Sequence, residues 1–457
     1  MKVIVAGAGL VGSNIARYLA AAGNDVTLID QRGELVRKLE DNLDIQAMIG
    51  HAAHPESLMK AGAADADMLI AVTQVDEVNM VACQVAHSLF NVPTKIARVR
   101  QQAYLTENWG TLFDRDHIPI DFVISPEVEV AHAIARRLEI PGALTVVSFL
   151  DQRIRLLGFR CTGETPVVHT PLRQLSYLFP DLHLVCVGIV RGGKFFVPGG
   201  DDQMLPDDDV LVVVENAHLD RTLSAFGIED QMGERIIIVG GGNVGLFLAQ
   251  ELEERYPHLS LKLIEFNQAR ATLVAEQLTR TVVLCGDARE RDLLEEANVR
   301  ASHSIVTVTN DDEVNIIAGL LARRLGCSRS LALVNNSNYN ILMDTIGIDV
   351  AINPREITVS SVLQHVKRGR LGSVHTIRDG EAEIFEAEAL ETSQIVDKPL
   401  RSLRLSGVII GAIVRDGKMI TPRGDTVVQA HDRLVVLARS DMSKKVEQLF
   451  AVRPDYF

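Results

Sequence analysis

The chain has 457 residues, of which 47% are apolar and 23% charged, and its net charge is −14 at pH 7. These proportions are those of globular proteins and exclude a disordered, collagen-like or disulfide-scaffold chain. The acidic balance argues against binding to nucleic acid, which needs a basic face, and against unaided docking on anionic lipid. No apolar run approaches the roughly 18 residues of a membrane helix.

The first residues, Met-Lys-Val-Ile-Val-Ala-Gly, lack the layout of a signal peptide and are typical of a core strand. The five cysteines are far apart, odd in number and include no C-x-x-C pair. We therefore expect buried, reduced thiols and a cytoplasmic protein.

The sequence is an internal repeat. VIVAGAGLVG (3–12) recurs as IIIVGGGNVG (236–245), IAVTQVDEVN (70–79) as VTVTNDDEVN (306–315), and IVRGGKFFVP (189–198) as IVRDGKMITP (413–422). The matched blocks follow the same order in both halves, which indicates a duplication. We predict four domains, at residues 1–123, 140–225, 233–350 and 368–453.

The first part of each half alternates short apolar runs with stretches of helical spacing, such as Val11, Ile15 and Leu19. In the first copy the predicted strands are 3–7, 26–30, 45–50, 68–73 and 95–99. Strands that alternate with helices at this spacing predict βαβ units on a parallel sheet covered on both faces. The expected fold class is α/β, with two Rossmann-like, doubly wound parallel-sheet domains.

The second part of each half is predicted to be a small α/β lobe that contains a β-hairpin. Gly192-Gly193 and Asp416-Gly417 separate alternating runs in the two copies. Such pairs suit two-residue primed turns, because glycine adopts positive φ at little cost.

A glycine-rich loop follows the first strand of each copy and opens a helix. The G-x-G-x-x-G spacing permits a tight turn, close approach of a pyrophosphate to the backbone, and packing of helix on strand. The alternative is a Rossmann-like fold with an empty pocket. The candidate binding residues are Gly7, Ala8, Gly9, Leu10, Val11 and Gly12, and in the second copy Gly240, Gly241, Gly242, Asn243, Val244 and Gly245.

A carboxylate ends the next strand in both copies, at Asp30 and Glu265. A carboxylate at this place accepts hydrogen bonds from ribose hydroxyls and repels a 2′-phosphate. It does not distinguish NAD from ATP or ADP, which carry the same ribose.

The predicted fourth strand ends at Thr73 in the first copy and at Thr309 in the second. Strand ends on the carboxyl side line the ligand crevice of such sheets, so Thr73, Gln74, Thr309 and Asn310 are candidate ligand contacts. Each is followed by a D-E-x-N segment, whose first residue, Asp76 in copy one, we interpret as a helix N-cap.

His51 and Asp287 follow the third strand of the two copies and are further candidates, with turn residues as the alternative. His51 and His54 are spaced for a metal, but the second copy has Asp287 and Glu290 there and no third ligand is near. We expect no metal site.

Arg98 and Arg100 alternate at the end of the predicted fifth strand, where the second copy has Leu333 and Asn335. Two cations at a strand tip suggest contact with phosphate, and the alternative is a surface ion-pair cluster. The phosphate interpretation predicts unequal pockets, with the more highly charged nucleotide in the first.

No catalytic constellation was found. G-x-S-x-G, H-E-x-x-H and a G-K-[ST] phosphate loop are absent, and no histidine recurs at matched positions in the two small lobes. A non-catalytic nucleotide sensor is therefore favoured over a soluble NAD-dependent oxidoreductase with duplicated domains. A free cytosolic nucleotide sensor without a membrane partner is a third interpretation.

The chain resembles the family of Trk-system potassium-uptake regulatory proteins over essentially its whole length. The resemblance rests on VIVAGAGLVG, on residues 64–93 and on IIIVGGGNVG. It implies tandem regulator-of-potassium-conductance (RCK) units, lobes that bind NAD(H) and ATP or ADP, and the pocket residues named above. It further implies a homotetramer with a ring of eight units, at the inner face of the cell membrane, that regulates an integral-membrane potassium channel or transporter.

Overall fold

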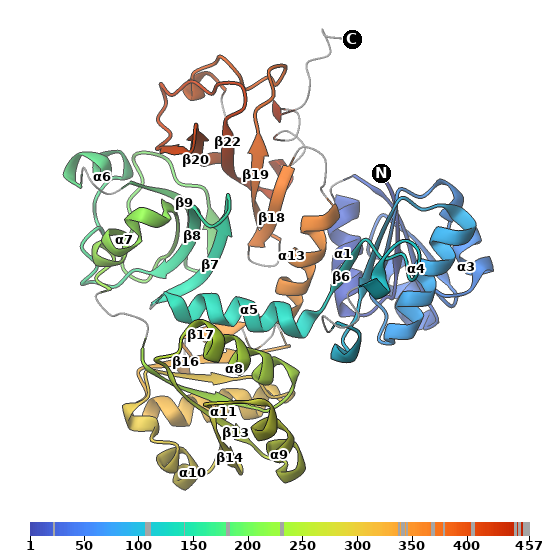
Figure 1. Cartoon of the computed structure of the whole chain (residues 1–457). Helices are drawn as coiled ribbons and strands as arrows, with labels where there is room; N and C mark the ends of the chain where they lie inside the picture. Colours follow the sequence, from blue (N-terminus) through green and yellow to red (C-terminus); the bar gives the residue numbers. More distant parts are fainter. Residues whose placement is uncertain are drawn as a thin grey trace. The chain divides into compact units, whose positions relative to one another are not determined.

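The computed structural model describes the chain except for residues 22, 106–110, 141, 180–182, 229–232, 337, 338, 340–342, 344, 345, 367–370, 378, 379, 404–406, 443–445, 447, 448 and 451–457. The chain forms two compact units (Figure 1). Unit 1 comprises residues 1–129 and 355–366, and unit 2 comprises residues 130–354 and 367–457. The four predicted domain limits remain a prediction, and residues 368 and 453 lie outside the described part.

Unit 1 contains a six-stranded parallel sheet in the order β3-β2-β1-β4-β5-β6. The five strands predicted from the sequence are confirmed to within two residues at each end. The strand bounds are β1 Lys2–Ala6, β2 Asp25–Asp30, β3 Gln46–Ile49, β4 Met68–Ala71, β5 Thr94–Arg98 and β6 Phe122–Ile124.

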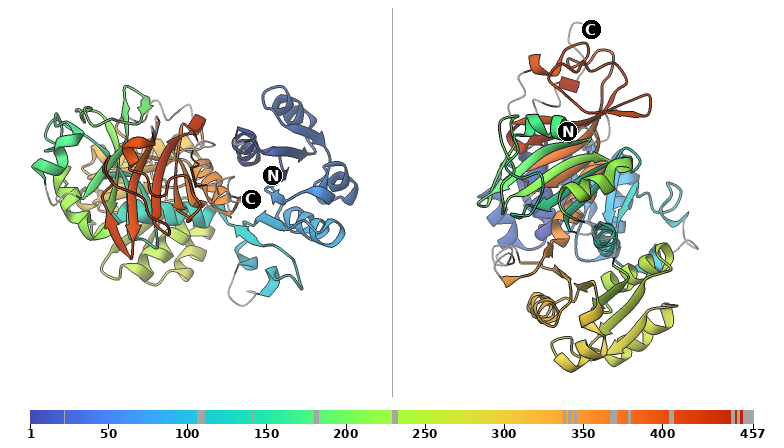
Figure 2. Two further views of the ribbon diagram at one scale, coloured as in Figure 1. Left: turned by 90° about the horizontal axis from the view of Figure 1, so that it is seen from above. Right: turned by 90° about the vertical axis from the view of Figure 1, so that its left-hand side faces the viewer.

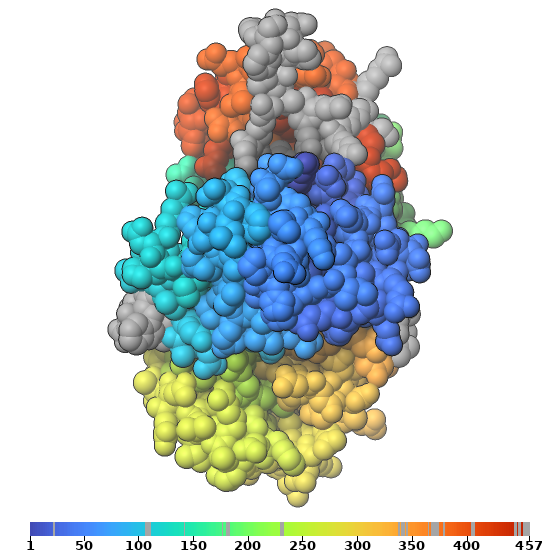
Figure 3. Space-filling view, turned by 90° about the vertical axis from the view of Figure 1, so that its right-hand side faces the viewer, coloured from blue at the N-terminus to red at the C-terminus, as the bar shows by residue number. Residues whose placement is uncertain are grey.

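Helices cover both faces of this sheet, which explains why its strands are apolar throughout. Ile15 and Leu19 of α1 (Leu10–Ala21) pack in one core, and Leu58 of α3 (Pro55–Lys60) and Cys83 of α4 (Asp76–Phe90) in the other. With α2 (Gly33–Glu40), these elements form one continuous body, drawn in blue in Figure 3. The doubly wound α/β class is confirmed.

Unit 2 contains a second parallel sheet in the equivalent order, β14-β13-β12-β15-β16-β17. Its strands are β12 Arg235–Val239, β13 Ser260–Glu265, β14 Val282–Cys285, β15 Ser304–Thr307, β16 Arg329–Leu333 and β17 Val350–Ile352. The helices that follow them are α8 Asn243–Arg255, α9 Gln268–Gln277, α10 Arg291–Glu296 and α11 Asp312–Arg324.

Unit 2 also holds two antiparallel sheets of equivalent order, β10-β9-β11-β8-β7 and β18-β19-β22-β20-β21. Both predicted hairpins are present, and all four turn residues have positive φ, from 50° to 77°. The strands are β7 Ala143–Phe149, β8 Ile154–Arg160, β9 Leu184–Arg191, β10 Lys194–Phe196, β11 Asp209–Glu215, β18 Leu371–Ile377, β19 Ala382–Glu388, β20 Val408–Arg415, β21 Lys418–Ile420 and β22 Arg433–Arg439. Two short helices, α6 Leu172–Leu178 and α7 Leu219–Ala225, accompany the first of these sheets.

The two antiparallel sheets share a core, with β9 and β11 lying against β20. Figure 2 shows the two sheets, coloured green and red, next to each other. Gly411 of β20 permits this close approach, because a Cβ there would stand 2.7 Å from Val213 and 3.1 Å from Val187. A hydrogen bond also joins the β7–β8 turn to the other sheet, since the Leu150 amide donates to the Glu386 carboxylate of β19 at 2.6 Å. The two small lobes therefore pack as one body within unit 2.

One helix follows the parallel sheet in each half, and neither was predicted from the sequence. Each of these helices packs on the parallel-sheet lobe of the other half. α13 (Pro354–Val366), from the second half, packs Val362 and Leu363 into the core beside α1 in unit 1. In unit 2 the last turns of α5 (Pro126–Glu139), from the first half, lie against α8 and β16: the Tyr256 hydroxyl donates to Glu139 at 2.6 Å, and Arg329 donates to the Arg137 carbonyl at 3.1 Å. Each parallel-sheet lobe is thus completed by a helix of the other half.

The thiol prediction is correct for four cysteines and wrong for one. Cys83, Cys161, Cys186 and Cys327 are buried, and burial raises the pKa of the first three to about 12, so they are unreactive. Cys285 is exposed, because it ends the edge strand β14. None of the described helices is both long and apolar enough to cross a bilayer.

Candidate functional site

The first glycine loop joins β1 to α1 by a turn that only glycine permits comfortably. Gly7 has φ +112°, and a Cβ on Gly7 would stand 3.0 Å from the Thr73 amide nitrogen. A Cβ on Gly12 would stand 1.9 Å from the Gly7 carbonyl oxygen, so helix and strand touch through this glycine. The second loop repeats the geometry, with Gly240 at φ +108° and a Gly245 Cβ 1.9 Å from the Gly240 oxygen.

The first turn of each helix carries the remaining loop candidates. Leu10 is 59% exposed, Val11 packs on the core, and in the second copy Asn243 is exposed and Val244 half-buried. Their amides lie at helix N-termini, where free N–H groups attract anions. Gly9 and Gly242 leave open backbone there, since a Cβ on Gly242 would meet nothing within 4 Å.

Both predicted carboxylates are hydrogen bonded to the glycine loop of their own copy. Asp30 accepts from the Ala8 amide at 2.7 Å, and Glu265 accepts from the Gly241 amide at 2.6 Å. Burial raises the pKa of Asp30, but hydrogen bonds from Arg32 and Ala8 outweigh it and hold the pKa below its usual value. Asp30 is therefore ionised at neutral pH beside the loop.

Thr73 and Thr309 lie two residues beyond the ends of β4 and β15, so the prediction that they end these strands is wrong. Gln74 and Asn310, the next residues, are exposed. Two asparagines that the sequence analysis did not select hold the threonines. Asn79 accepts from the Thr73 amide at 2.9 Å and donates to the Arg98 carbonyl at 2.9 Å.

The second copy repeats this bridge with Asn315. Its side chain accepts from the Thr309 amide at 2.8 Å and hydroxyl at 2.7 Å, and it donates to the carbonyls of Thr309 and Leu333. Both asparagines are fully buried. The D-E-x-N segment present in both copies was the sequence feature that could have found them.

The N-cap interpretation of Asp76 is wrong. Asp76 is the first residue within α4, and its carboxylate accepts from the amides of Arg100 and Gln101 at 2.8 and 2.7 Å. Asp312 does the same for Asn335 and Asn336, and Asp311 is the N-cap of α11. These carboxylates fix the loop that follows the fifth strand.

Arg98 and Arg100 have different environments. β5 ends at Arg98, and Arg100 lies outside the strand, where its Nε donates to the Glu127 carboxylate at 2.7 Å. The Arg98 Nε is buried and has no hydrogen-bond partner among the described residues. Burial lowers the pKa of Arg98, and the charge of Arg100 lowers it further. Arg100 thus fits the ion-pair alternative, and Arg98 retains an unused donor.

His51 and Asp287 follow the third strand of their sheets. The His51 Nδ1 accepts from the Ala53 amide at 3.2 Å, and its ring stacks on His54 at 4.3 Å between centroids. Asp287 pairs with Arg289 at 2.6 Å. In the described part of the chain, no group of three or more His, Cys, Asp or Glu side chains could hold a metal ion.

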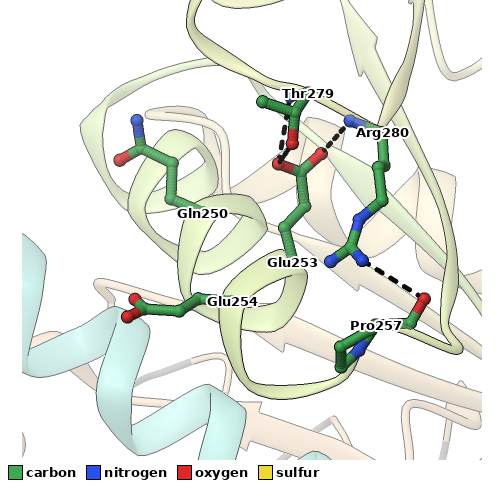
Figure 4. Close-up of a pocket in the computed structure, with 6 residues that line it drawn as sticks. All are labelled: Gln250, Glu253, Glu254, Pro257, Thr279 and Arg280. Carbon is green, nitrogen blue, oxygen red and sulfur yellow. Dashed lines mark hydrogen bonds between the residues drawn. The ribbon is translucent and has the colours of Figure 1, made fainter.

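A separate shallow pocket of about 420 Å³ lies at the end of α8, away from the glycine loop (Figure 4). The Glu253 carboxylate accepts five hydrogen bonds there, from the amides and hydroxyls of Thr279 and Thr281 and the amide of Arg280. Burial raises the pKa of Glu253, but these bonds lower it to about 2. The carboxylate is saturated, so we interpret it as a structural clamp.

Glu253→Gln is expected to lower the free energy of unfolding by about 2 kcal/mol at neutral pH, because the amide donor faces backbone N–H groups. The folded pKa of Glu253 is depressed, so its stabilisation is present above about pH 4.5 and is lost as the pH falls toward 2. Urea unfolding at pH 7 and pH 3 should show the deficit shrink in acid. Glu254→Gln, at an exposed position, is the matched control. Equal losses of unfolding free energy in the two variants would contradict the structural role of Glu253.

The TrkA-N domain family matches residues 3–126 and 236–354, and the TrkA-C domain family matches residues 384–451. The Trk system potassium uptake protein TrkA of Azorhizobium caulinodans is 50% identical, with full coverage of both chains. The protein of that name from Vibrio alginolyticus is 39% identical over 99% of each chain.

Among solved structures, the GsuK channel aligns with a TM-score of 0.61 at 18% identity, covering 99% of this chain and 79% of its own. The GsuK channel bound to NAD aligns with a TM-score of 0.60 and the same coverage. The crystal structure of the GsuK RCK domain gives 0.59, with 99% and 95% coverage. At these identities the likeness establishes the fold.

Proposed function

Because the chain belongs to the family of Trk system potassium uptake proteins TrkA, we propose that it is a nucleotide-binding regulatory subunit. In this proposal it binds NAD(H) and ATP or ADP, carries out no catalysis, and gates a Trk-type integral-membrane potassium channel or transporter. It acts in the cytoplasm, at the inner face of the cell membrane. Four chains would supply a ring of eight RCK units.

The observation that carries the proposal is the pair of glycine loops, each bonded to its own carboxylate. The Ala8–Asp30 and Gly241–Glu265 bonds hold a carboxylate beside a helix N-terminus in both copies, which supports a role for each carboxylate as a ribose acceptor. The candidate contacts are those predicted from the sequence, with Thr73, Gln74, Thr309 and Asn310 on the neighbouring loops. The NAD-bound neighbour of the same fold supports a dinucleotide as one ligand.

Gating requires that a nucleotide bind one ring shape more tightly than another, since a ligand with equal affinity for both shifts nothing. The Thr73–Asn79–Arg98 bridge and its counterpart at Asn315 connect the pocket loops to the fifth strands of their sheets. In unit 2 that strand, β16, contacts α5 through Arg329. These contacts give a nucleotide at the second loop a physical connection to α5.

The experiment is calorimetric titration of the full chain with NAD+, NADH, ADP and ATP, followed by a search for turnover with alcohols, amino acids and hydroxy acids. We expect up to two nucleotides per chain and no consumption. Nucleotide-dependent redox turnover would favour the oxidoreductase instead. Co-sedimentation with membranes that contain the transporter distinguishes a membrane-associated subunit from a free sensor.

Arg98→Gln is expected to weaken ATP binding at the first pocket about tenfold and adenosine binding little, because a desolvated guanidinium favours phosphate. Arg100→Gln should weaken ATP binding less, since the Arg100 Nε already donates to the Glu127 carboxylate. Titration of both variants with adenosine and ATP checks this. Equal ATP affinity of wild type and the Arg98 variant would refute a phosphate role.

A further inference from the structure

In the first pocket the predicted ribose acceptor is already saturated. A carboxylate offers about four acceptor positions. Oδ1 of Asp30 accepts from the Arg32 amide at 2.8 Å and the Arg32 Nε at 3.1 Å. Oδ2 accepts from the Ala8 amide at 2.7 Å and the Arg32 guanidinium at 3.2 Å. A ribose diol can bond this carboxylate only if the guanidinium leaves.

The second pocket differs in this respect. Glu265 accepts one hydrogen bond on each oxygen, from the Gly241 amide at 2.6 Å and the Asn267 amide at 2.8 Å. The nearby Arg270 donates to the Gly241 carbonyl at 2.7 Å and leaves the carboxylate uncovered. A ribose can therefore bond Glu265 without displacing a side chain.

Arg32 is placed to move to a phosphate. Its side chain is 52% exposed, so the guanidinium can leave the carboxylate toward solvent, whereas the Asp30 side chain is 10% exposed and needs another hydrogen-bond donor in its place. Its terminal nitrogen lies 3.9 Å from where a Cβ on Gly9 would stand. The second glycine of such a loop is the point of closest approach of a pyrophosphate.

We propose that Arg32 is an exchangeable counter-ion that makes the first pocket select nucleoside di- and triphosphates over uncharged nucleosides. This inference rests on the proposed nucleotide-binding function. In the empty pocket the guanidinium neutralises Asp30. On binding, the ribose hydroxyls take its place on the carboxylate and the guanidinium bonds the pyrophosphate over Gly9. A nucleoside must displace the guanidinium from Asp30 and gains no phosphate bond in return. A nucleotide gains both the ribose–Asp30 bond and the phosphate–Arg32 bond.

The test compares adenosine and ADP binding in a Glu265→Ala background, in which the second pocket lacks its ribose acceptor. Arg32→Gln should bind adenosine about two- to fivefold more tightly, because the competitor is gone. It should bind ADP about tenfold more weakly, because the charge-assisted bond is lost. Arg32→Lys, which keeps the charge, should retain most of the preference for ADP. Arg37→Gln removes an exposed arginine of α2, the helix whose N-cap is Arg32, and should leave both affinities unchanged.

An unchanged ratio of ADP to adenosine affinity in Arg32→Gln would overturn the exchange. A second result would also overturn it: a wild-type preference for NADP+ over NAD+ that Arg32→Gln removes, with the ratio of ADP to adenosine affinity unchanged. Arg32 would then bond a 2′-phosphate. If the wild-type chain binds no nucleotide at either pocket, the proposed function fails and the inference with it. If nucleotides bind but the ratio does not move, only the inference fails.

Discussion

Alanine at Gly245 is expected to lower the free energy of unfolding of unit 2 by about 3 kcal/mol and to abolish nucleotide binding at the second loop. The new Cβ would stand 1.9 Å from the Gly240 carbonyl oxygen and 3.4 Å from Val308. The nearest neighbour is a backbone oxygen, which cannot rotate away, so α8 must move off β12. Chemical denaturation measures the loss, and Gly12→Ala should repeat it in unit 1.

Gly242→Ala is the matched control within the same loop. Its Cβ would meet nothing within 4 Å, so stability should change by less than about 0.5 kcal/mol. The methyl group would nevertheless occupy the approach of a pyrophosphate, and nucleotide affinity should fall about tenfold or more. Equal stability losses for Gly242→Ala and Gly245→Ala would contradict the separate roles assigned to these glycines.

Asn315→Leu is expected to lower the free energy of unfolding by about 3 kcal/mol and to weaken nucleotide binding at the second loop. Leucine preserves the size of the side chain but leaves the Thr309 amide and the carbonyls of Thr309 and Leu333 without partners. Each buried group left unsatisfied costs about 1–3 kcal/mol, and relaxation recovers part of this. Asn79→Leu should behave alike in unit 1.

Thermal or urea unfolding checks the stability loss, and calorimetry checks the binding loss. The exposed Asn310→Leu serves as the stability control, since its side chain is solvated. A fully stable Asn315→Leu protein would contradict the bridge between the fourth- and fifth-strand loops. A destabilised protein with unchanged nucleotide affinity at the second loop would show that the Asn315 bridge contributes to stability but not to nucleotide binding.

The elements that could be predicted were those specified by local sequence. Five strands of the first copy followed from buried apolar runs, and the hairpin turns from Gly192-Gly193 and Asp416-Gly417, which adopt positive φ as expected. The glycine loops were predictable because their spacing is imposed by one tight turn. The carboxylates Asp30 and Glu265 followed because they end a strand directly beside that turn.

The features that could not be predicted depend on contacts between distant residues. The periodicity of residues 354–366 is compatible with a helix, but nothing local indicates that Val362 packs with α1 of the other half. Similarly, Arg100 could not be assigned to an ion pair until the fold placed Glu127 beside it. Asn79 of α4 and Asn315 of α11 were overlooked because a buried amide and a solvated one look identical in sequence, although their recurrence in both copies was visible.

In the proposed function, nucleotide occupancy of the two loops controls potassium transport. The most direct measurement is potassium flux into liposomes that contain a reconstituted Trk-type membrane subunit, with this chain added in the presence and absence of ADP, ATP or NADH. We predict that flux responds to nucleotide with wild-type protein, and that a Gly9→Ala, Gly242→Ala variant, which should fold normally, abolishes the response. Flux that is the same with and without nucleotide, or a full response from the double variant, would contradict the account.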